Sequence, residues 1–560
     1  MNWLRYATND DTTMVAIAAG GYGGEPSPYV VNIHYLIGYL LKTLYVRIPA
    51  VNWFTVWYLS MYLLAFTFIT YIIVMSCRRK RSVLFVCLMT AAMSFYLFMS
   101  FFSFTVVAYA LLTAGMAGVS YDEGQDSHGT SGHHTIFAIS IIYIILAAMM
   151  RSDVINTAIV MIMAYGITTS LVFRDKRYLK SIVAMLLILA IIELLAASSN
   201  TWLLKREATE AAFFEWGEIR SKALDCTQVP YDEGLFSKHG FSETSYDACY
   251  GAFYYIRDAV SINHLQHLID WNTNRYHSHI IGYVIAHFRA YAVPGYGRIW
   301  QGLFAFVVLA GIVAGCKKSR IKMLGLYASV IAADYAYYFI GRPMMHVMMP
   351  TYVMGSLLGT IMITCTVGGE GDGTKTKPGM KYRICVGIAI LFFVIAAGSI
   401  YKDPKIYSMT LTTEEADALH EGREYMRDHP DKLFIAMDPA VFAISTDEDM
   451  WHNRYVTEPY NLAGNWEIYS IPSNAMMESY GIDPTDPGKD FVDNDKVVFL
   501  SSRADGVDTQ TNYIIELYRE YYGIGDVEFK LIENLDNWTA WKLEKAEGEE
   551  NKRKRTRLIN

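Results

Sequence analysis

Two adjacent carboxylates, Asp10 and Asp11, stand in the stretch NDDTTM ahead of a strongly apolar chain. A carboxylate can act as the general base that takes a proton from an attacking hydroxyl group. Cations supply the complementary chemistry, because a guanidinium grips a phosphate through two N–H donors at once. The sequence offers such cations beside its predicted membrane spans, at Arg151, Arg342 and His346.

The composition places the chain among membrane proteins. Of its 560 residues, 53% are apolar and 14% aromatic, and long apolar runs contain no charged residue. Uncharged runs of this length are typical of membrane helices rather than of a large soluble core. The formal net charge of -7 gives no indication of a nucleic-acid partner.

The apolar runs predict ten spans, because each is roughly long enough to cross about 30 Å of hydrocarbon at about 1.5 Å per residue. The run 83–118 is too long for one helix, so we expect a helical hairpin that turns near 101–103. The predicted spans are 53–76, 83–101, 102–118, 133–150, 154–173, 178–198, 298–316, 323–341, 345–367 and 384–401.

Loop charges orient these spans. Four loops with four Lys or Arg residues each fall on one side of the membrane, which the positive-inside rule makes cytoplasmic. The loop 119–132 belongs to the same side although it has no Lys or Arg. The basic loops are RRKR (78–81), RDKRYLK (174–180), KKSRIK (317–322) and GGEGDGTKTKPGMKYR (368–383).

Three segments are then expected together outside the cytoplasm. Residues 1–52 form a loop that carries the acidic pair, and the apolar stretch 28–46 predicts one or two helices lying in the membrane interface. The bundle 53–401 includes a second outer segment, the loop 199–297. The third is the soluble region 402–560. The alternative is that 30–46 is itself a membrane span, which would place the N-terminus on the other side of the membrane.

The pattern of residues 402–560 predicts an α/β domain. TTEE (412–415) is a capping box that begins a helix reaching about Asp428. Short apolar runs at 432–438 and 496–502 predict strands, and 508–523 predicts an amphipathic helix that ends at glycine. EFKLIENL and NWTAWKLE predict a closing hairpin. The overall expectation is a mostly α fold, a helical membrane bundle with a C-terminal α/β domain.

Two cysteines share the long outer loop. Cys226 and Cys249 could form a disulfide if that loop lies outside the cytosol. The sequence contains no pair of cysteines at zinc-binding spacing.

The order of these features resembles the GT-C superfamily of multispan glycosyltransferases, which includes protein O-mannosyltransferases and a bacterial aminoarabinose transferase. The family places a membrane helix before its acidic loop, whereas here the motif follows Met1 within ten residues. The resemblance therefore implies a chain without that first helix, through a misplaced gene start or a truncation. The stretches that carry it are NDDTTM (9–14), GGYGGEPSPY (20–29), LYVRIPAVNWF (44–54), FTVVAYALLTAG (104–115), AAMMRSD (147–153), EWGEIRSKALD (215–225) and GRPMMHVMMP (341–350).

The resemblance implies transfer of a sugar from polyprenyl phosphate to an extracytoplasmic glycan, lipid or protein, with inversion, at a bacterial plasma membrane. Polyprenyl phosphate is already a good leaving group, so the site needs one base and cations rather than the two carboxylates of ordinary glycoside hydrolysis.

The resemblance also assigns roles to residues. Asp10 would be the base, and Asp11 would orient it or bind the acceptor or a metal. A divalent metal could replace some of the cations. Arg151, Arg342 and His346 would hold the phosphate, and the further candidates are Glu25, Asp153, Arg220 and His287.

Other interpretations remain open at this point. The acidic pair could be a solvated loop or a helix cap, and the arginines could be interfacial side chains that reach for water. Asp334, inside a predicted span, would suit a transporter or flippase, or could simply be hydrogen-bonded. A third interpretation is a non-catalytic envelope assembly protein whose C-terminal domain binds partners.

Overall fold

The computed structural model describes most of the chain. In the N-terminal two thirds it describes Tyr6, 9–76, 81–124, 131–173, 176–225, 230–278, 281–282, 285, 299–314, 317–339, 345–368, 387, 389–396 and 398. In the remainder it describes 413–546, except 438, 447–449, 457, 459, 465 and 503–506.

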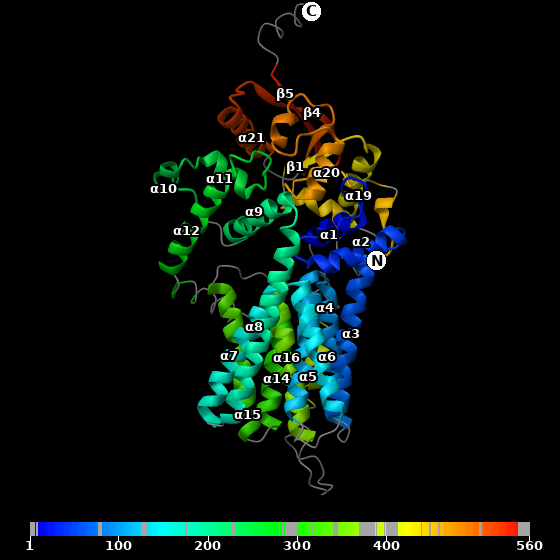
Figure 1. Ribbon diagram of the computed structural model, residues 1–560, viewed down its shortest axis with the longest axis vertical. Helices are drawn as coiled ribbons and strands as arrows, with labels where there is room; N and C mark the ends of the chain where they lie inside the picture. Colours follow the sequence, from blue (N-terminus) through cyan, green and yellow to red (C-terminus); the bar gives the residue numbers. More distant parts are fainter. Residues whose placement is uncertain are drawn as a thin grey trace, which may run out of the picture.

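A bundle of long helices forms the lower part of the molecule (Figure 1). Six of the described helices are long and apolar enough to cross a membrane, and two shorter apolar helices accompany them. These helices make the chain an integral membrane protein. The bundle contains α3 (Trp53–Ser76), α4 (Arg81–Ser100), α5 (Phe104–Gly124), α6 (Ser131–Met150), α7 (Asp153–Phe173), α8 (Lys176–Leu204), α14 (Ile299–Ala314), α15 (Lys317–Phe339) and α16 (Met345–Gly368).

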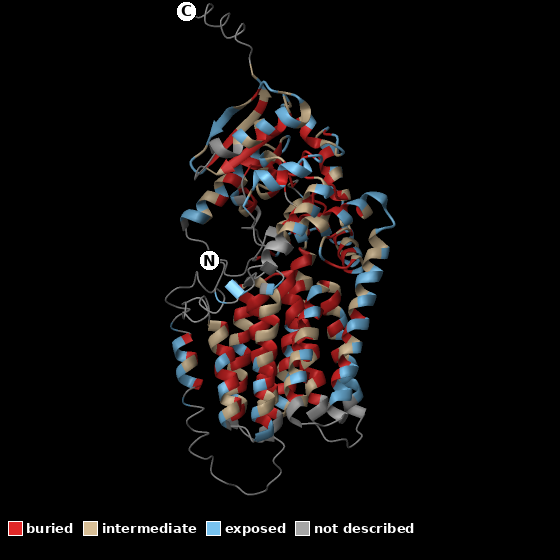
Figure 2. Ribbon diagram, turned by 90° about the vertical axis from the view of Figure 1, so that its left-hand side faces the viewer, coloured by how far each residue is buried: buried red, intermediate tan, exposed pale blue. Residues whose placement is uncertain are grey.

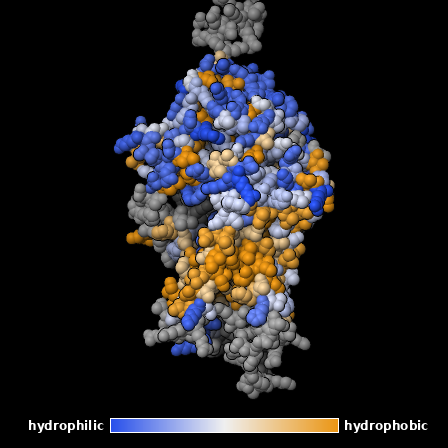
Figure 3. Space-filling view, in the orientation of Figure 1, coloured by the Kyte–Doolittle hydropathy of each residue, from blue (hydrophilic) through white to orange (hydrophobic). Residues whose placement is uncertain are grey.

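The surface of the bundle is apolar, and the region above it is polar. On the face that Figure 3 shows, hydrophobic residues cover the helices of the bundle, and hydrophilic residues predominate in the region above them. Large apolar side chains such as Leu64 on α3 and Leu194 on α8 are more than half exposed. Such exposure is expected of side chains that face lipid, because lipid tails are as apolar as the side chains themselves. Figure 2 shows buried residues inside the bundle and in the domain above it.

Small residues allow α5 and α6 to approach closely. A Cβ atom on Gly115 would lie 2.7 Å from the backbone oxygen of Ser140, and one on Gly118 would lie 2.0 Å from the Ser140 hydroxyl oxygen. Glycines at such positions let the backbones of membrane helices pack against each other.

Two helices from the N-terminal segment lie on one end of the bundle, called here the domain end (Figure 1). They are α1 (Asn9–Ala19) and α2 (Tyr35–Arg47). His34 ties this segment to the bundle, because its backbone N–H donates to the Met149 oxygen at 2.9 Å and its ring bonds the Ser199 hydroxyl at 2.9 Å. The apolar side chains of Leu36, Tyr39 and Leu40 on α2 are exposed, as a helix lying in a membrane interface requires.

The long loop between α8 and α14 also folds at the domain end (Figure 1). Trp216 of α9 is buried and packs edge-on against Tyr254 and Tyr469. The loop therefore has a core that it shares with the C-terminal domain. Its elements are α9 (Ala208–Leu224), α10 (Glu233–Phe236), η1 (Ser237–His239), α11 (Glu243–Tyr250) and α12 (Ile262–Ser278).

The C-terminal domain, residues 413–546, is built on a five-stranded sheet in the order β2-β1-β3-β5-β4. β1 pairs in parallel with β2 and β3, whereas β5 is antiparallel to β3 and β4. The strands are β1 (Leu433–Ala436), β2 (Leu462–Ala463), β3 (Val497–Ser502), β4 (Val527–Asn534) and β5 (Trp538–Lys545). The helices are α19 (Thr413–Asp428), η2 (Pro439–Thr446), η3 (Arg454–Val456), α20 (Ile471–Ser479), η4 (Pro487–Phe491) and α21 (Val507–Tyr522).

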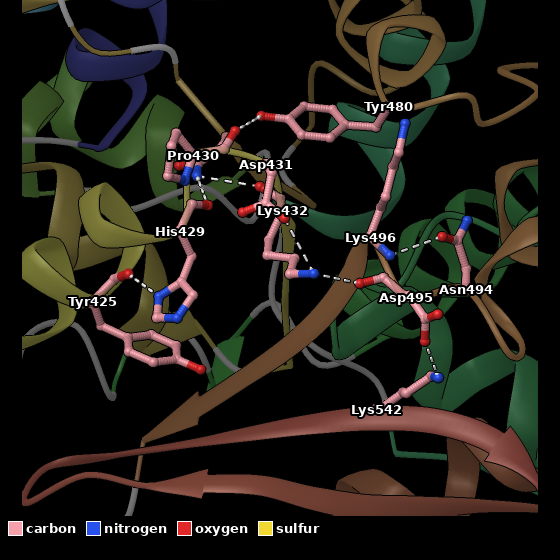
Figure 4. A network of polar contacts seen from close by, with 11 residues as sticks. Tyr425, His429, Pro430, Asp431, Lys432, Tyr480, Asn494, Asp495, Lys496 and Lys542 are labelled. Carbon is pink, nitrogen blue, oxygen red and sulfur yellow. Dashed lines mark hydrogen bonds and ion pairs between the residues drawn. The ribbon is translucent and has the colours of Figure 1, made fainter.

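The two edges of the parallel strands have different surroundings. At the amino ends of β1 and β3, Lys432 donates to the Asp495 backbone oxygen at 2.9 Å and Lys542 pairs with the Asp495 carboxylate (Figure 4). Ion pairs as exposed as this one contribute little stability. The opposite, carboxyl edge faces the bundle, and η2, which follows β1, packs against α1.

Several sequence predictions are confirmed. The fold is mostly α, with a helical membrane bundle and a small C-terminal α/β region. The hairpin turns between Ser100 and Phe104, and a helix runs from Thr413 to Asp428. Nine of the ten predicted spans correspond to described helices. Within the tenth predicted span, 384–401, residues 389–396 are helical.

The close approach of α5 and α6 yields a stability prediction. We expect Gly115→Ala to lower the melting temperature in detergent, because its Cβ would force the Ser140 backbone away, and overpacking of this kind costs roughly 1–3 kcal/mol. Gly217→Ala on α9 is the control, because a Cβ there meets nothing within 4 Å. Equal melting temperatures for the two variants would contradict the packing described here.

Candidate functional site

Asp11 anchors α1 to the membrane bundle. Its carboxylate is fully buried, and Oδ1 accepts hydrogen bonds from the Tyr58 hydroxyl at 3.1 Å and from the Phe104 backbone N–H at 2.9 Å. Phe104 is the first residue of α5, so the Asp11 carboxylate caps the positive end of a membrane helix. The second member of the acidic pair therefore holds the first in place.

Asp10 lies in the first turn of α1, and its side chain is only partly buried. Oδ1 accepts a 2.6 Å hydrogen bond from the indole N–H of Trp466. Removal from bulk water raises the pKa of Asp10, while the Trp466 hydrogen bond and the charges of Arg220 and Arg151 lower it. In the part of the chain that the structure describes, both guanidinium groups form ion pairs with other carboxylates, Arg151 with Asp153 and Arg220 with Asp225, and neither is paired with Asp10.

The C-terminal domain supplies the residues that cover Asp10. Trp466 and Glu467 follow β2 at the carboxyl edge of the sheet, where ligands bind in many open α/β sheets. Tyr469 keeps this turn in an unusual conformation, because its φ of 73° lies in the left-handed region that non-glycine residues seldom adopt. Ser470 then caps α20 through the Ser473 N–H. The turn is thus held from both sides.

Glu467 is a second carboxylate close to Asp10. It is 2% exposed, and its Oε1 accepts a hydrogen bond from the Tyr22 hydroxyl at 2.8 Å. Burial, with the charge of Asp10 adding to it, raises the pKa of Glu467 to about 7. The Tyr22 ring stacks on Tyr460 with 4.9 Å between ring centroids, and the Tyr460 N–H donates to the Gly21 oxygen. The acidic loop and the C-terminal domain therefore form one surface.

Helix α9 brings a cation to the same place. The Arg220 side chain is 13% exposed and lies 3.4 Å from Oδ1 of Asp225. On the same helix, the buried Glu210 accepts a 2.7 Å hydrogen bond from the Ile471 N–H, at the first residue of α20. Burial raises the pKa of Glu210 to about 7. The outer loop is therefore attached to the C-terminal domain beside Asp10.

Arg151 lies at the junction between α6 and α7 on the domain end. Its Nη1 donates to the Thr105 hydroxyl at 2.6 Å, its guanidinium lies 5.1 Å from the Phe104 ring centroid, and Asp153 is 3.7 Å away. Beneath it, inside the bundle, Tyr109 bonds the hydroxyls of Thr157, Tyr337 and Thr351. The end of the bundle near Asp10 thus carries a guanidinium over a group of hydroxyls.

The predicted site residues fall into three groups. Asp10, Arg151 and Arg220 lie together, Asp11 supports them, and Asp153 lies beside Arg151 with its own side chain 66% exposed. Glu25 is exposed on the loop after α1, and His346 is partly buried in the first turn of α16. Arg342 and His287 lie outside the described residues, so their roles stay predictions.

The disulfide prediction finds no support among the described residues, and the possible divalent metal stays a prediction. Cys249 carries a free, buried thiol, which counts against its disulfide with Cys226, a residue outside the described part of the chain. Among the residues that the structure describes, no group of three His, Cys, Asp or Glu side chains is arranged to hold a metal ion.

Sequence reasoning did not identify Trp466, Glu467 or Tyr22. Trp466 lies 456 positions along the chain from its partner Asp10, and Glu467 lies 445 positions from its partner Tyr22. The stretch AGNWEIYS between β2 and α20 has no periodicity that distinguishes it from an ordinary loop. The one available signal was the acidic residue beside tryptophan after a short apolar run, and that pattern is too common to single out a site.

Comparison with known proteins leaves the family open. No protein-family model and no curated protein matches the sequence. Among solved structures, the crystal structure of ArnT from Cupriavidus metallidurans bound to undecaprenyl phosphate aligns over 96% of this chain and 94% of its own, with 11% sequence identity and a TM-score of 0.35. This score is too low to establish a shared fold.

The two carboxyls with raised pKa values predict how stability depends on pH. An acid whose pKa is higher in the folded state binds its proton more tightly there, so Glu210 and Glu467 stabilise the fold fully below about pH 4.5 and lose that contribution as pH rises past about 7. Each shift corresponds to about 3 kcal/mol at most. We expect the melting temperature in detergent to fall between pH 5 and pH 8.

Substitution identifies the groups responsible. In a Glu210→Gln, Glu467→Gln double variant the melting temperature should change less over the same pH interval than in the unaltered protein. A pH dependence that is unchanged in the double variant, or a melting temperature that rises with pH in the unaltered protein, would exclude these carboxyls as the cause.

Proposed function

We propose that this chain is an integral membrane glycosyltransferase that moves a sugar from a polyprenyl-phosphate donor to a hydroxyl group outside the cytoplasm. One observation carries the proposal: the Asp10 carboxylate, held by the Trp466 indole N–H, lies within electrostatic reach of the guanidinium groups of Arg151 and Arg220 at the end of an apolar helical bundle. A base next to phosphate-binding cations at a membrane surface suits a donor whose phosphate is anchored in lipid. The resemblance of NDDTTM and its neighbours to GT-C enzymes points the same way.

The proposed reaction is a single displacement. The acceptor hydroxyl oxygen attacks C1 of the sugar and forms the new glycosidic bond, while the bond between C1 and the phosphate oxygen breaks. The electron pair leaves with the polyprenyl phosphate, and the acceptor proton passes to Asp10. Because attack and departure occur on opposite faces, the configuration at C1 inverts.

Arg151 is the proposed phosphate ligand. Its guanidinium uses one N–H on Thr105 and lies against Phe104, so the group is held at the bundle end by contacts that leave other N–H donors available. Positive charge there stabilises the charge that develops on the leaving phosphate. The second predicted phosphate ligand, Arg342, remains a proposal from sequence.

The transporter alternative has less support. Asp334 is the buried carboxylate that suggested it, and Tyr352 donates a 2.8 Å hydrogen bond to its Oδ2. A buried acid held by a neighbouring helix needs no moving ion to account for it. No comparable observation favours an assembly protein without activity.

The first test is sugar transfer in proteoliposomes supplied with polyprenyl-phosphate sugars. We expect Asp10→Asn to lower kcat by about 10²–10⁴, because it removes the base and keeps the shape of the side chain. Glu207→Gln is the matched control, since Glu207 is an exposed acid at the start of α9 with no capping hydrogen bond. Equal turnover by Asp10→Asn and the control would rule out Asp10 as the base, and no turnover with any donor would overturn the proposal.

The phosphate role of Arg151 yields a separate prediction. Arg151→Lys keeps the charge but loses the planar pair of donors, so we expect the KM for the donor to rise by about tenfold and Arg151→Gln to raise it further. Arg206→Lys, at an exposed arginine that lies over Trp202, serves as the control. Polyprenyl phosphate binding followed by native mass spectrometry should weaken in the same order. Unchanged donor affinity in Arg151→Gln would remove Arg151 from the phosphate site.

A further inference from the structure

Two buried polar atoms near Asp10 have no hydrogen-bond partner among the described residues. They are Oε2 of Glu467, in the C-terminal domain, and Nε of Arg220, on α9. Buried polar groups in folded proteins are nearly always paired, and an unpaired buried charge is costly. Two such atoms from distant segments, both electrostatically coupled to Asp10, indicate a place built for a ligand group.

Among the described residues, only one of the two carboxylate oxygens of Glu467 accepts a hydrogen bond. Tyr22 occupies Oε1, and Tyr22 itself is fixed by its stack on Tyr460. The left-handed backbone of Tyr469 fixes the turn from the other side. A carboxylate positioned in this way keeps its second oxygen at a fixed place inside the protein, which is the property of a preorganised recognition group.

We propose that Glu467 and Arg220 recognise the acceptor, and that the acceptor is a neutral polyhydroxy compound, a sugar or a polyol. The hydroxyl beside the attacking one would donate to Oε2 of Glu467 and accept from the Nε–H of Arg220. A hydroxyl group is both a donor and an acceptor, so one group satisfies both unpaired atoms. This inference rests on the proposed transfer reaction and names its second substrate.

The charges around the site favour a neutral acceptor. Asp10 and Asp225 are balanced by Arg220 and Arg151, and the donor phosphate brings further negative charge to Arg151. A cationic amine would face the guanidinium of Arg220, and an anionic group would face the carboxylates. A neutral group with several hydroxyls adds no charge and leaves the balance unchanged.

The aromatic residues at the same place suit a sugar ring. Trp466 is partly exposed while its indole N–H holds Asp10, and Tyr455, also partly exposed, packs edge-on against Tyr460. Side chains of this kind offer an apolar ring together with a polar tip. The apolar face of a sugar could pack on such a ring while its hydroxyls bond the carboxylates.

The test compares acceptors with and without hydroxyl groups beside the attacking one. Proteoliposomes with a polyprenyl-phosphate sugar receive glycerol or 1-propanol at equal concentration, and transfer to each is measured alongside transfer to water. We expect the unaltered protein to favour glycerol by about tenfold or more, because a site built to bond a hydroxyl rejects the analogue that lacks it. Glu467→Gln should reduce this preference to about twofold.

Two further variants make the result specific. Glu467→Gln keeps an amide oxygen for the Tyr22 hydroxyl, so the turn should stay folded. Glu478→Gln, an exposed acid in the neighbouring α20, should behave as the unaltered protein, whereas Asp10→Asn should lose transfer to every acceptor. A glycerol preference that survives in Glu467→Gln would overturn the proposal.

A binding experiment separates this proposal from the transfer reaction. Saturation-transfer NMR with a methyl glycoside reports acceptor binding without any donor. Binding that is lost in Glu467→Gln and kept in Glu478→Gln supports the site even if no donor is turned over, an outcome that would count against the proposed reaction alone. Equal binding by both variants, or none by the unaltered protein, would refute the acceptor site.

Discussion

The arrangement at the domain end depends on one buried carboxylate. The Asp11 carboxylate lies away from water, and the Tyr58 hydroxyl and the Phe104 backbone N–H, which belong to two different membrane helices, both donate to it. The same contact caps α5 and seats α1 against the bundle. With α1 seated, Asp10 has a fixed position within electrostatic reach of Arg151, and the C-terminal domain has a fixed surface to meet.

Three separate parts of the chain meet at this surface, each through backbone as well as side-chain contacts. The segment before α3 forms an isolated antiparallel bridge between Val51 and His452, and the Asn453 N–H donates to the Ala50 oxygen. Glu210 attaches α9 to the start of α20. Since each contact joins a different pair of segments, the soluble part is held to the bundle at several points, and the geometry around Asp10 is correspondingly defined.

Local patterns predicted much of the fold. The absence of charge in 83–118 predicted the hairpin, and the capping box at 412–415 predicted the start of α19 to within a residue. Helix α1 was not predicted, because its residues MVAIAA are buried on all sides and give no amphipathic period. Resemblance identified Asp10, whereas Glu467 could not be found, since its significance lies in a contact with Tyr22 across 445 positions.

The distance along the chain between Asp10 and Trp466 has a consequence for biosynthesis. The two residues are 456 positions apart, and synthesis proceeds at roughly 5–20 residues per second. The acidic helix is therefore synthesised roughly 20 to 90 seconds before the indole that covers it. The last described helix of the bundle, α16, ends at Gly368, before Trp466 is made. A ribosome that stalled between these residues would therefore leave a membrane protein whose Asp10 carboxylate lacks its indole partner.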